Sequence, residues 1–502
     1  MFRRKVIREL KENKLGYAAC ITVIAIGLMI YASFAVVSEN LTASQVNFYR
    51  DQNFADGYAD IMEMPAREVD RLKKIDGIRD LQGRTMEEVR VLFPGKTENV
   101  YLKLVSFDPR LNNPINAFML TAGSLPDAQD SKKDIILDNK FFEANHLRLN
   151  DELEVVIKGK KVKFTVAGAA RNPEFIYALR TAGDVFPDPE KYGVAYLPYE
   201  TMQSLLGKKN TVNSIVFTLE PGTDFDDVKP VLERELKPYG ILSLYPRKDQ
   251  PSHLMLNQEL DGIKATSRSM PAVFLTIAAV VLYIMMRRTV EQQRGQIGVL
   301  KALGYKDSEI MLHYLSYSVI IGLLGGALGG AAGIALSFPL TSAYEMFFNM
   351  PGLESRISLR YLLESLLISL IFSAAAGYSG CKGILALQPS QAMRPPTPSP
   401  GKQIPLERLG SFWNMLTVQG KMAFRNLYRN PKRSVIVFIG ITFAFSLAGM
   451  TWATKQLSEK MLFEQFEKVE TYDTKIIFTD PRKRDKALWE LNRFPGVKKA
   501  EP

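Results

Sequence analysis

The sequence is poor in the residue types that build disulfides, metal sites and nucleophilic centres. It contains two cysteines, Cys20 and Cys381, and three histidines, His146, His253 and His313, among 502 residues. Both cysteines lie in apolar stretches, so the long polar region between them has to fold without disulfides. No histidine has a second ligand-type residue at metal-binding spacing, and we expect all three to be structural.

A nucleotide-binding loop is missing as well. No segment matches G-x-x-x-x-G-K-S/T, the loop whose backbone amides and lysine hold nucleotide phosphates. No other arrangement of residues indicates catalysis, so we predict that the chain is not an enzyme and binds no cofactor or metal. Any energy that it uses is expected to come from a partner.

The positive charge of the chain is unevenly distributed. The formal net charge is +11, and Lys and Arg cluster at 3–14, 287–306 and 421–433, directly beside long apolar runs. Basic flanks of membrane spans favour the cytoplasmic side. The charge therefore indicates topology, with the N-terminus cytoplasmic and 38–269 extracytoplasmic, and nucleic acid is not an expected partner.

Apolar runs long enough to cross a bilayer, which takes roughly 17 to 25 helical residues, recur along the chain. We predict membrane spans at 15–37, 270–286, 312–338, 361–387 and 434–452. A cleaved signal peptide is the alternative for the first run, but that run exceeds the usual apolar core of a signal peptide. The segments between the spans are a cytoplasmic basic helix (1–14), an extracytoplasmic domain with a stalk (38–269), a cytoplasmic helix (287–311), an external loop (339–360), a cytoplasmic linker (388–433) and a second external region (453–502).

The extracytoplasmic domain is expected to be α+β. It has about 230 residues, enough to bury a core of its own. Strand-like segments lie at 134–137, 152–157, 161–167 and 214–218. A helix is predicted over 223–237, where Asp224, Asp226 and Asp227 suit the positive end of the helix dipole. Residues 254–269 are predicted to form a stalk that continues into the second span.

The sequence also contains two short matches in register. Segment 8–14 resembles 425–431, and segment 72–78 resembles 491–497. We expect a second copy of the anchor-plus-ectodomain unit to begin near Leu416, and the chain to be truncated within it. The alternative is that basic-to-apolar junctions look alike in any membrane protein.

Glycines recur every four residues in the third predicted span. Each of the two series lines one helical face and permits close approach of a second helix. We predict a packing seam, inside the chain or in a dimer; the alternative is a glycine-rich helix without a specific partner. The two series are Gly322, Gly326 and Gly330, and Gly325, Gly329 and Gly333.

The cytoplasmic segment 287–311 has an amphipathic pattern. Ile297, Leu300 and Leu303, with Val299 nearby, form an apolar stripe outside the bilayer core. Such a stripe needs either the membrane surface or a groove in a protein, and periodicity alone does not decide between them.

Two motifs resemble signatures of the FtsX-like (MacB-type) permease family. Residues 297–304, reading IGVLKALG between two spans, look like the family's E-I-G-x-L-R/K-A-L-G, and 386–394 resemble its P-x-x-A-L-R exit from the fourth span. Two positions depart from these signatures. Gln296 stands where the family usually has Glu, which removes a charge, and Met393 replaces the usual Leu. The resemblance implies a multi-pass α-helical membrane protein with a large α+β extracytoplasmic domain: one span, the ectodomain, three spans, then the start of a second repeat.

The resemblance also implies a division of labour with a cytoplasmic ABC ATPase dimer, which would bind ATP and Mg²⁺. That dimer would grip the coupling helix, and its closure would move the external domain. The residues implied in coupling are Glu291, Arg294, Gln296, Ile297, Gly298, Leu300, Lys301, Ala302, Leu303 and Gly304.

The implied function is export or extraction of a lipid, lipoprotein, peptide or antimicrobial at the cell membrane. The alternative is a signalling or scaffold protein that activates a cell-wall enzyme or senses a drug. Membrane lipid and a second permease copy or half are the other expected partners.

Overall fold

The computed structural model describes residues 14–501, except 94–95, 97, 127–133, 182–183, 185, 354–356, 386–387, 394–403, 409, 430, 465–475 and 477–483. The chain forms two compact units, Met1–Pro398 and Ser399–Pro502. The predicted basic helix at 1–14 and the prolines of the cytoplasmic linker fall largely outside the described residues.

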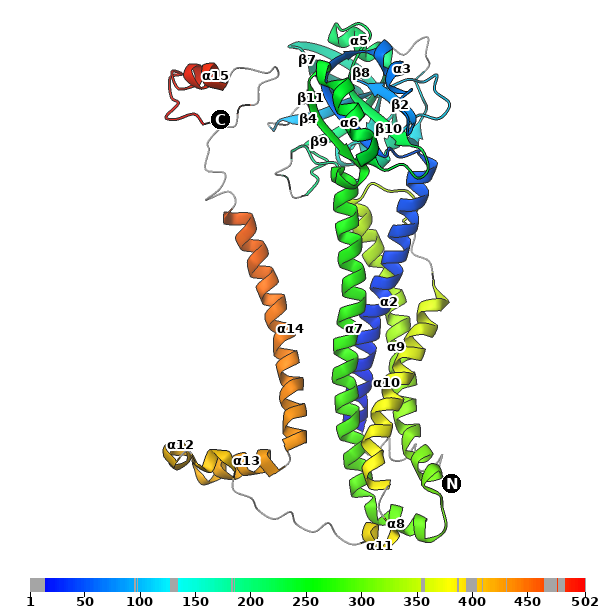
Figure 1. Cartoon of the computed structure of the whole chain (residues 1–502), viewed down its shortest axis with the longest axis vertical. Helices are drawn as coiled ribbons and strands as arrows, with labels where there is room; N and C mark the ends of the chain where they lie inside the picture. The colour runs from blue at the N-terminus through cyan, green and yellow to red at the C-terminus, as the bar shows by residue number, and fades with distance from the viewer. Residues whose placement is uncertain are drawn as a thin grey trace. The chain divides into compact units, whose positions relative to one another are not determined.

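Four long helices of the first unit each contain an apolar stretch that can cross a membrane. They are α2 (Lys14–Asp51), α7 (Pro251–Gln292), α9 (Asp307–Phe347) and α10 (Leu359–Leu385). The 38 residues of α2 extend roughly 57 Å, well beyond a bilayer core of about 30 Å. Figure 1 shows α2 and α7 continuing past the bundle to the extracytoplasmic domain, the head. The predicted stalk and second span are thus one continuous helix.

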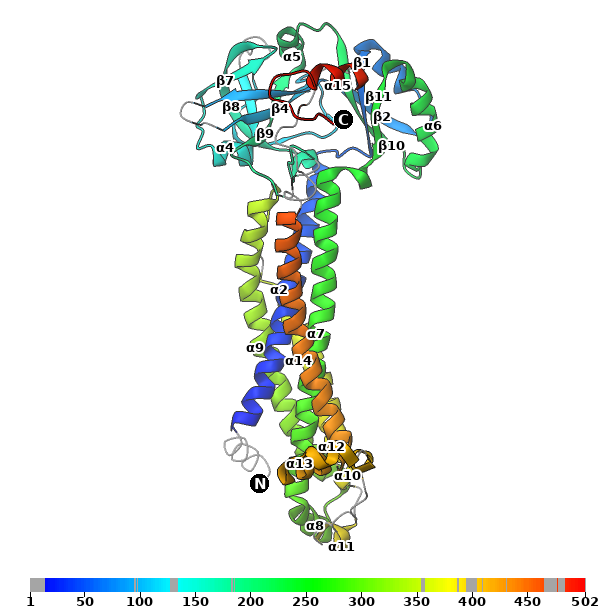
Figure 2. The same cartoon turned by 90° about the vertical axis from the view of Figure 1, so that its left-hand side faces the viewer.

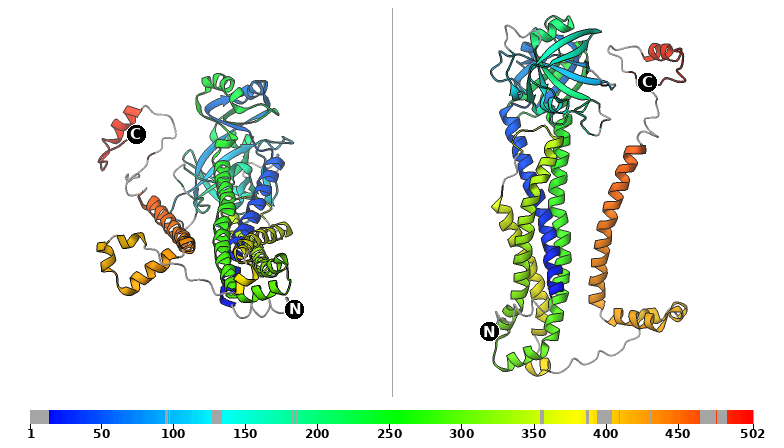
Figure 3. Two further views of the ribbon diagram at one scale, coloured as in Figure 1. Left: turned by 60° about the horizontal axis from the view of Figure 1, so that its bottom comes forward. Right: turned by 180° about the vertical axis from the view of Figure 1, so that it is seen from behind.

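The bundle core is apolar along the contact between these helices. Ile24 and Leu28 from α2, Leu282 from α7 and Tyr317 and Ile321 from α9 are buried in one cluster. Figure 3 shows the same helices running alongside one another from behind. The helices therefore bury a common face and leave other apolar residues, such as Leu323 and Leu367, exposed for lipid.

The head consists of two lobes, seen side by side in Figure 2. The first lobe is a four-stranded antiparallel sheet in the order β11-β1-β10-β2, with one face covered by α3 (Val69–Leu72) and α6 (Phe225–Leu236). This β-α-β-β-α-β arrangement is ferredoxin-like. Its strands are β1 (Gly57–Pro65), β2 (Ile78–Arg84), β10 (Thr211–Leu219) and β11 (Ile241–Pro246).

The second lobe is inserted between β2 and β10 and closes into a barrel. The long strand β8 pairs with β7 through its first half and with β6 through its second half, which joins the two ends of the sheet. Alternate residues such as Leu102, Leu104 and Phe164 fill the interior. The elements are β3 (Met86–Leu92), β4 (Val100–Phe107), β5 (Met119–Gly123), β6 (Asp134–Asp138), α4 (Asn139–Ala144), β7 (Glu152–Ile157), β8 (Lys160–Arg171), β9 (Tyr192–Pro198) and α5 (Tyr199–Leu206).

The predicted strands at 134–137, 152–157, 161–167 and 214–218 are confirmed as parts of β6, β7, β8 and β10. The helix predicted over 223–237 is confirmed as α6. Asp224 is its N-cap, and the Asp227 carboxylate accepts a hydrogen bond from the backbone N–H of Asp224. The acidic residues thus fix the start of the helix.

The second unit contains α12 (Gly410–Met415), α13 (Val418–Arg429), α14 (Pro431–Glu464) and α15 (Arg484–Leu491). The predicted fifth span, 434–452, lies inside α14, and its place in a membrane stays a prediction. The matched segments 72–78 and 491–497 each follow a short helix and turn at a glycine with positive φ, +90° at Gly77 and +95° at Gly496. Glycine adopts this conformation without steric cost, so the two matches share a local turn as well as a pattern.

Candidate functional site

The predicted coupling segment 287–311 is divided among three helices. Residues up to Gln292 belong to α7, and the chain bends at Gln293, whose side chain accepts a 2.6 Å hydrogen bond from Tyr314 of α9. A separate short helix, α8, follows at Arg294–Ala302. The chain leaves α8 through Gly304, whose φ of +91° turns it toward α9.

The apolar stripe predicted for this segment is split between two environments. Ile297 is fully buried at the end of the bundle, and Leu300 packs partly against the same cluster. Leu303 is 71% exposed and Val299 49% exposed. Leu303 lies six residues after Ile297, which places it about 120° away around the helix. One face of α8 is therefore anchored, and a second face with Gln296, Val299 and Leu303 is open.

The charged residues of α8 mostly hold it in place. The Lys301 side chain is only 8% exposed and pairs with Asp307 in the first turn of α9 at 2.7 Å. Arg294 donates to the Gln391 carbonyl at 2.7 Å. Glu291, exposed on α7, lies 3.6 Å from Arg287. Ala302 and Gly304 are exposed beside the open face.

The short helix α11 (Pro389–Met393), which lies near the end of the first unit in the sequence, packs against α8. A Cβ atom at Gly298 would lie 2.8 Å from Met393 Cγ and 3.2 Å from Ala392 Cβ. The two sequence motifs that carry the family resemblance therefore touch each other. Sequence reasoning missed this contact; the small residues Gly298 and Ala392 were the available signal.

The two glycine series of α9 face two different helices. A Cβ at Gly322 would lie 2.7 Å from Ser373 Oγ of α10, and Gly330 faces Ser365 of the same helix. A Cβ at Gly329 would lie 2.6 Å from the Ala25 carbonyl of α2. Gly326 belongs to the face toward α10, whereas Gly325 and Gly333 face α2. Both faces are thus covered by helices of the same chain.

Two of the three histidines, His253 and His313, contact aromatic side chains. His253 Nδ1 is 3.1 Å from the Tyr49 hydroxyl, and its Nε2 is 2.7 Å from Asn257 Nδ2. The contact with Tyr49 joins α2 to α7, whereas Asn257 lies one turn further along α7. Within the residues that the structure describes, no group of three His, Cys, Asp or Glu side chains is placed to hold a metal.

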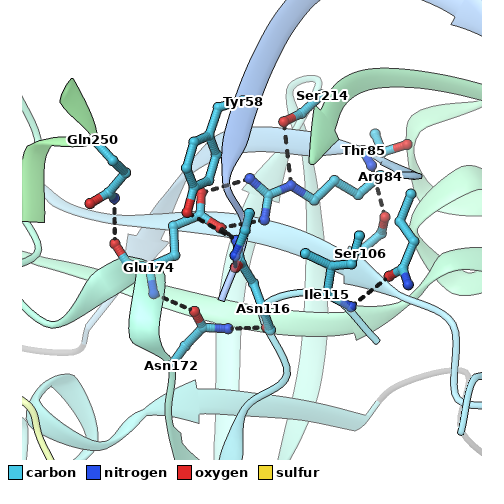
Figure 4. Close-up of polar contacts among 12 residues, drawn as sticks. Tyr58, Arg84, Thr85, Ser106, Ile115, Asn116, Asn172, Glu174, Ser214 and Gln250 are labelled. Atoms are coloured by element: carbon cyan, nitrogen blue, oxygen red, sulfur yellow. Dashed lines mark hydrogen bonds and ion pairs between the residues drawn. The ribbon is translucent and has the colours of Figure 1, made fainter. Parts of the chain in front are cut away.

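The two lobes of the head meet at a buried ion pair, shown in Figure 4. Arg84, at the end of β2, donates two hydrogen bonds of 2.5 and 2.6 Å to Glu174, which follows the barrel strand β8. Their side chains are 10% and 5% exposed. Burial alone would lower the pKa of Arg84, but the adjacent Glu174 carboxylate raises it above the usual value.

Glu174 also receives bonds from a connecting loop and from the stalk. Asn116 Nδ2 donates to its carboxylate at 2.7 Å, and Gln250, the N-cap of α7, donates to its carbonyl at 2.7 Å. We call Arg84, Asn116, Glu174 and Gln250 the hub. It connects both lobes to the start of α7, and nothing in the sequence pattern predicted it.

The long apolar helices and the folded head define a membrane protein with an extracytoplasmic domain, in which helix α8 is anchored to the bundle. Residues 268–389, which include α8, α9 and α10, match the family model described as FtsX-like permease C-terminal. Over this region the chain is similar to FtsX-like permeases, and its four apolar helices and α+β head confirm the predicted fold class.

Curated relatives carry the name "Macrolide export ATP-binding/permease protein MacB". The protein of Escherichia coli (strain K12) is 28% identical over 206 residues, which cover 39% of this chain and 30% of the relative. That of Salmonella typhimurium (strain LT2) is 27% identical over 218 residues, 41% of this chain and 32% of the relative. The match thus spans about a third of the length of these relatives.

Two solved structures are also similar to parts of the chain. The periplasmic region of MacB from Actinobacillus actinomycetemcomitans is 12% identical, with a TM-score of 0.27, and covers 43% of this chain and 97% of that structure. The extracellular domain of the transporter YknZ from Gram-positive bacteria is 12% identical, with a TM-score of 0.25, and covers 37% and 92%.

Proposed function

We propose that the chain is the non-ATPase subunit of an ABC transporter, and that a separate cytoplasmic ABC ATPase dimer docks on the open face of α8. The ATPase would bind ATP and Mg²⁺, because the sequence of this chain has no P-loop. The observation that carries the proposal is the anchoring of α8. Ile297 is buried against the bundle and Lys301 pairs with α9, so a displacement of α8 has to move α7 and α9 as well.

The movement would reach the head through α7. This helix continues without a break from Pro251 to Gln292, roughly 63 Å, and its N-cap residue Gln250 binds the hub. A tilt of its cytoplasmic end would therefore change the angle of the head. With α8 and the N-terminus in the cytoplasm, this arrangement supports transmission of force across the membrane.

We propose that the head uses this force to export or extract a lipid, lipoprotein, peptide or antimicrobial compound outside the bilayer. A second permease copy or half would complete the complex on the ATPase dimer. A scaffold that only signals would hydrolyse ATP without moving cargo, so a transport assay with reconstituted vesicles separates the two functions.

The docking face is tested by Leu303→Asp. Leu303 is 71% exposed, so the exchange leaves the fold intact and places a charge where an apolar contact is proposed. We expect affinity for the co-expressed ATPase to fall about tenfold, equivalent to about 1.4 kcal/mol, with ATP hydrolysis by the complex reduced accordingly. Co-purification and hydrolysis rates are the measurements.

Leu242→Asp is the matched control, because Leu242 is 67% exposed but lies on β11 of the head. It should leave ATPase binding unchanged. Unaltered binding in the Leu303→Asp variant would remove α8 as the docking element.

A further inference from the structure

The first part of the connection between α9 and α10 packs against the base of the head. Residues Phe348–Leu353, which we call the latch loop, lie inside the predicted external loop. Phe348 is 5% exposed and Met350 0% exposed. They share an apolar cluster with Tyr177 of the head, Leu41 of α2 and Leu260 of α7. The latch loop thus fills the junction between bundle and head.

Polar contacts fix the latch loop to the barrel lobe. The Asn349 amide N–H donates to the Ile176 carbonyl at 2.8 Å, and Asn349 Nδ2 donates to Asp138 Oδ1 at 2.6 Å. Arg171, at the end of β8, donates to the Met350 carbonyl at 2.8 Å. Asn349 and Asp138 are 2% and 3% exposed, so their bond forms away from water.

The lobes of the head therefore receive contacts from different helices. The chain enters the head from α2 and leaves it into α7, whose N-cap binds the hub between the lobes. The latch loop adds a non-covalent connection from α9, the helix that Lys301 ties to α8. The chain connections to α2 and α7 alone would let the head tilt relative to the bundle. The contact from the latch loop restrains this tilt.

We propose that the latch loop is a second route of force from α8 to the head, with Asn349 as the positioning residue that closes it on Asp138. The inference rests on the proposed function. It adds a specific contact between the latch loop, which connects α9 and α10, and the barrel lobe. When α9 moves, the barrel lobe follows through this contact, while α7 acts at the hub.

The contact is tested by Asn349→Asp in the full chain in lipid nanodiscs, without an ATPase. The variant places a second carboxylate against Asp138, so the latch loop should detach from the barrel lobe. We expect hydrogen exchange to lose protection at 348–353 and 176–177 while the barrel strands keep theirs. The double variant Asp138→Asn/Asn349→Asp exchanges amide and carboxylate and should restore protection, since Asn also caps α4 well.

Asn112→Asp makes the same exchange at an exposed loop position and should change nothing. Asn349→Ala, which removes only the side-chain bond, replaces Asn349→Asp if that variant does not fold. Unchanged protection in the folded variant, or no rescue by the double variant, would overturn the latch.

The role in transmission is tested with the partner ATPase. We expect ATP to alter hydrogen exchange in the barrel lobe of the wild type, and this response to be lost in Asn349→Asp although ATP hydrolysis persists. A response that survives in the variant overturns the second route. A wild type without any response contradicts the proposed function, whereas the contact itself is judged by the measurement without ATPase.

Discussion

At the scale of single residues, the hub makes the stability of the head depend on Glu174. Glu174→Ala removes one partner of the ion pair and leaves Arg84 buried with its charge uncompensated. Loss of one partner of such a pair costs about 3–5 kcal/mol. We expect the free energy of unfolding of the head to fall by about that amount, measured by pulse proteolysis in urea.

Lys163→Ala provides the comparison for this variant. Lys163 pairs with Glu152 at 2.8 Å, but both side chains are about two-thirds exposed, at 64% and 66%. Exposed pairs contribute about 0–1 kcal/mol because water and salt screen them. A similar loss in the two variants would mean that the hub contributes no more than a surface ion pair.

Asp138 should make the stability of the head depend on pH. Burial raises its pKa from 3.8 to about 7, although the amides of Phe141 and Lys140 and the side chain of Asn349 act in the opposite direction. Because the folded pKa lies above the unfolded one, the folded head binds more protons between these values. The contribution of Asp138 to stability is therefore fully present below pH 3.8 and is lost as the pH rises toward 7.

Thermal unfolding of the chain between pH 4 and 8 measures this dependence. Asp138→Asn should remove the pH dependence that this group contributes to stability, while Asn still caps α4. An identical pH profile for the variant and the wild type would assign the dependence to other groups.

At the scale of elements, the seam between α9 and α2 requires glycine. A leucine at Gly329 would meet the Ala25 carbonyl and Leu28 Cβ, since even a Cβ there would lie within 2.6 and 2.9 Å of them. Overpacking of this kind costs about 1–3 kcal/mol or more, because backbone cannot yield as a flexible side chain does. We expect Gly329→Leu to lower the melting temperature of the purified chain. Gly262→Leu, on an exposed face of α7 with no atom within 4 Å, should not.

The contact between α8 and α11 is tested by a pair of variants on the same helix. At Gly298 an added side chain meets Met393 and Ala392, whereas at Gly295 no atom lies within 4 Å of the added Cβ. Gly298→Leu should displace α11 and reduce ATP hydrolysis by the reconstituted complex by about tenfold, or about 1.4 kcal/mol. Gly295→Leu should retain the wild-type rate, and equal rates for the two variants would argue against a role for α11 in coupling.

At the scale of the whole molecule, the predicted topology places α8 and the head on opposite sides of the membrane. Lys209→Cys on the head should react with a membrane-impermeant thiol reagent in intact cells, and Leu303→Cys only after permeabilisation. Both positions are exposed, whereas the native Cys20 and Cys381 are buried and should stay unreactive. Labelling of both engineered positions from outside would contradict the orientation and, with it, the proposed docking of a cytoplasmic ATPase.

Local pattern was sufficient for much of this architecture. Charge-free runs predicted the long apolar helices, because a bilayer demands about 20 apolar residues in a row. Alternation and turn residues predicted strands such as 152–157, and the acidic cluster predicted the start of α6 at Asp224. Four-residue glycine spacing indicated close helix packing. Each of these patterns predicts a single helix or strand from residues that are close together in the sequence.

Tertiary structure alone decided which of these elements meet. The hub joins Arg84 to Glu174, the latch joins Asp138 to Asn349, and α8 meets α11 across about 90 residues of chain. No periodicity relates such residues, since their proximity follows from closure of the barrel and alignment of the helices. The same packing buried the Lys301 side chain and left Leu303 exposed, and the apolar stripe predicted for the segment did not separate Leu303 from the buried Ile297.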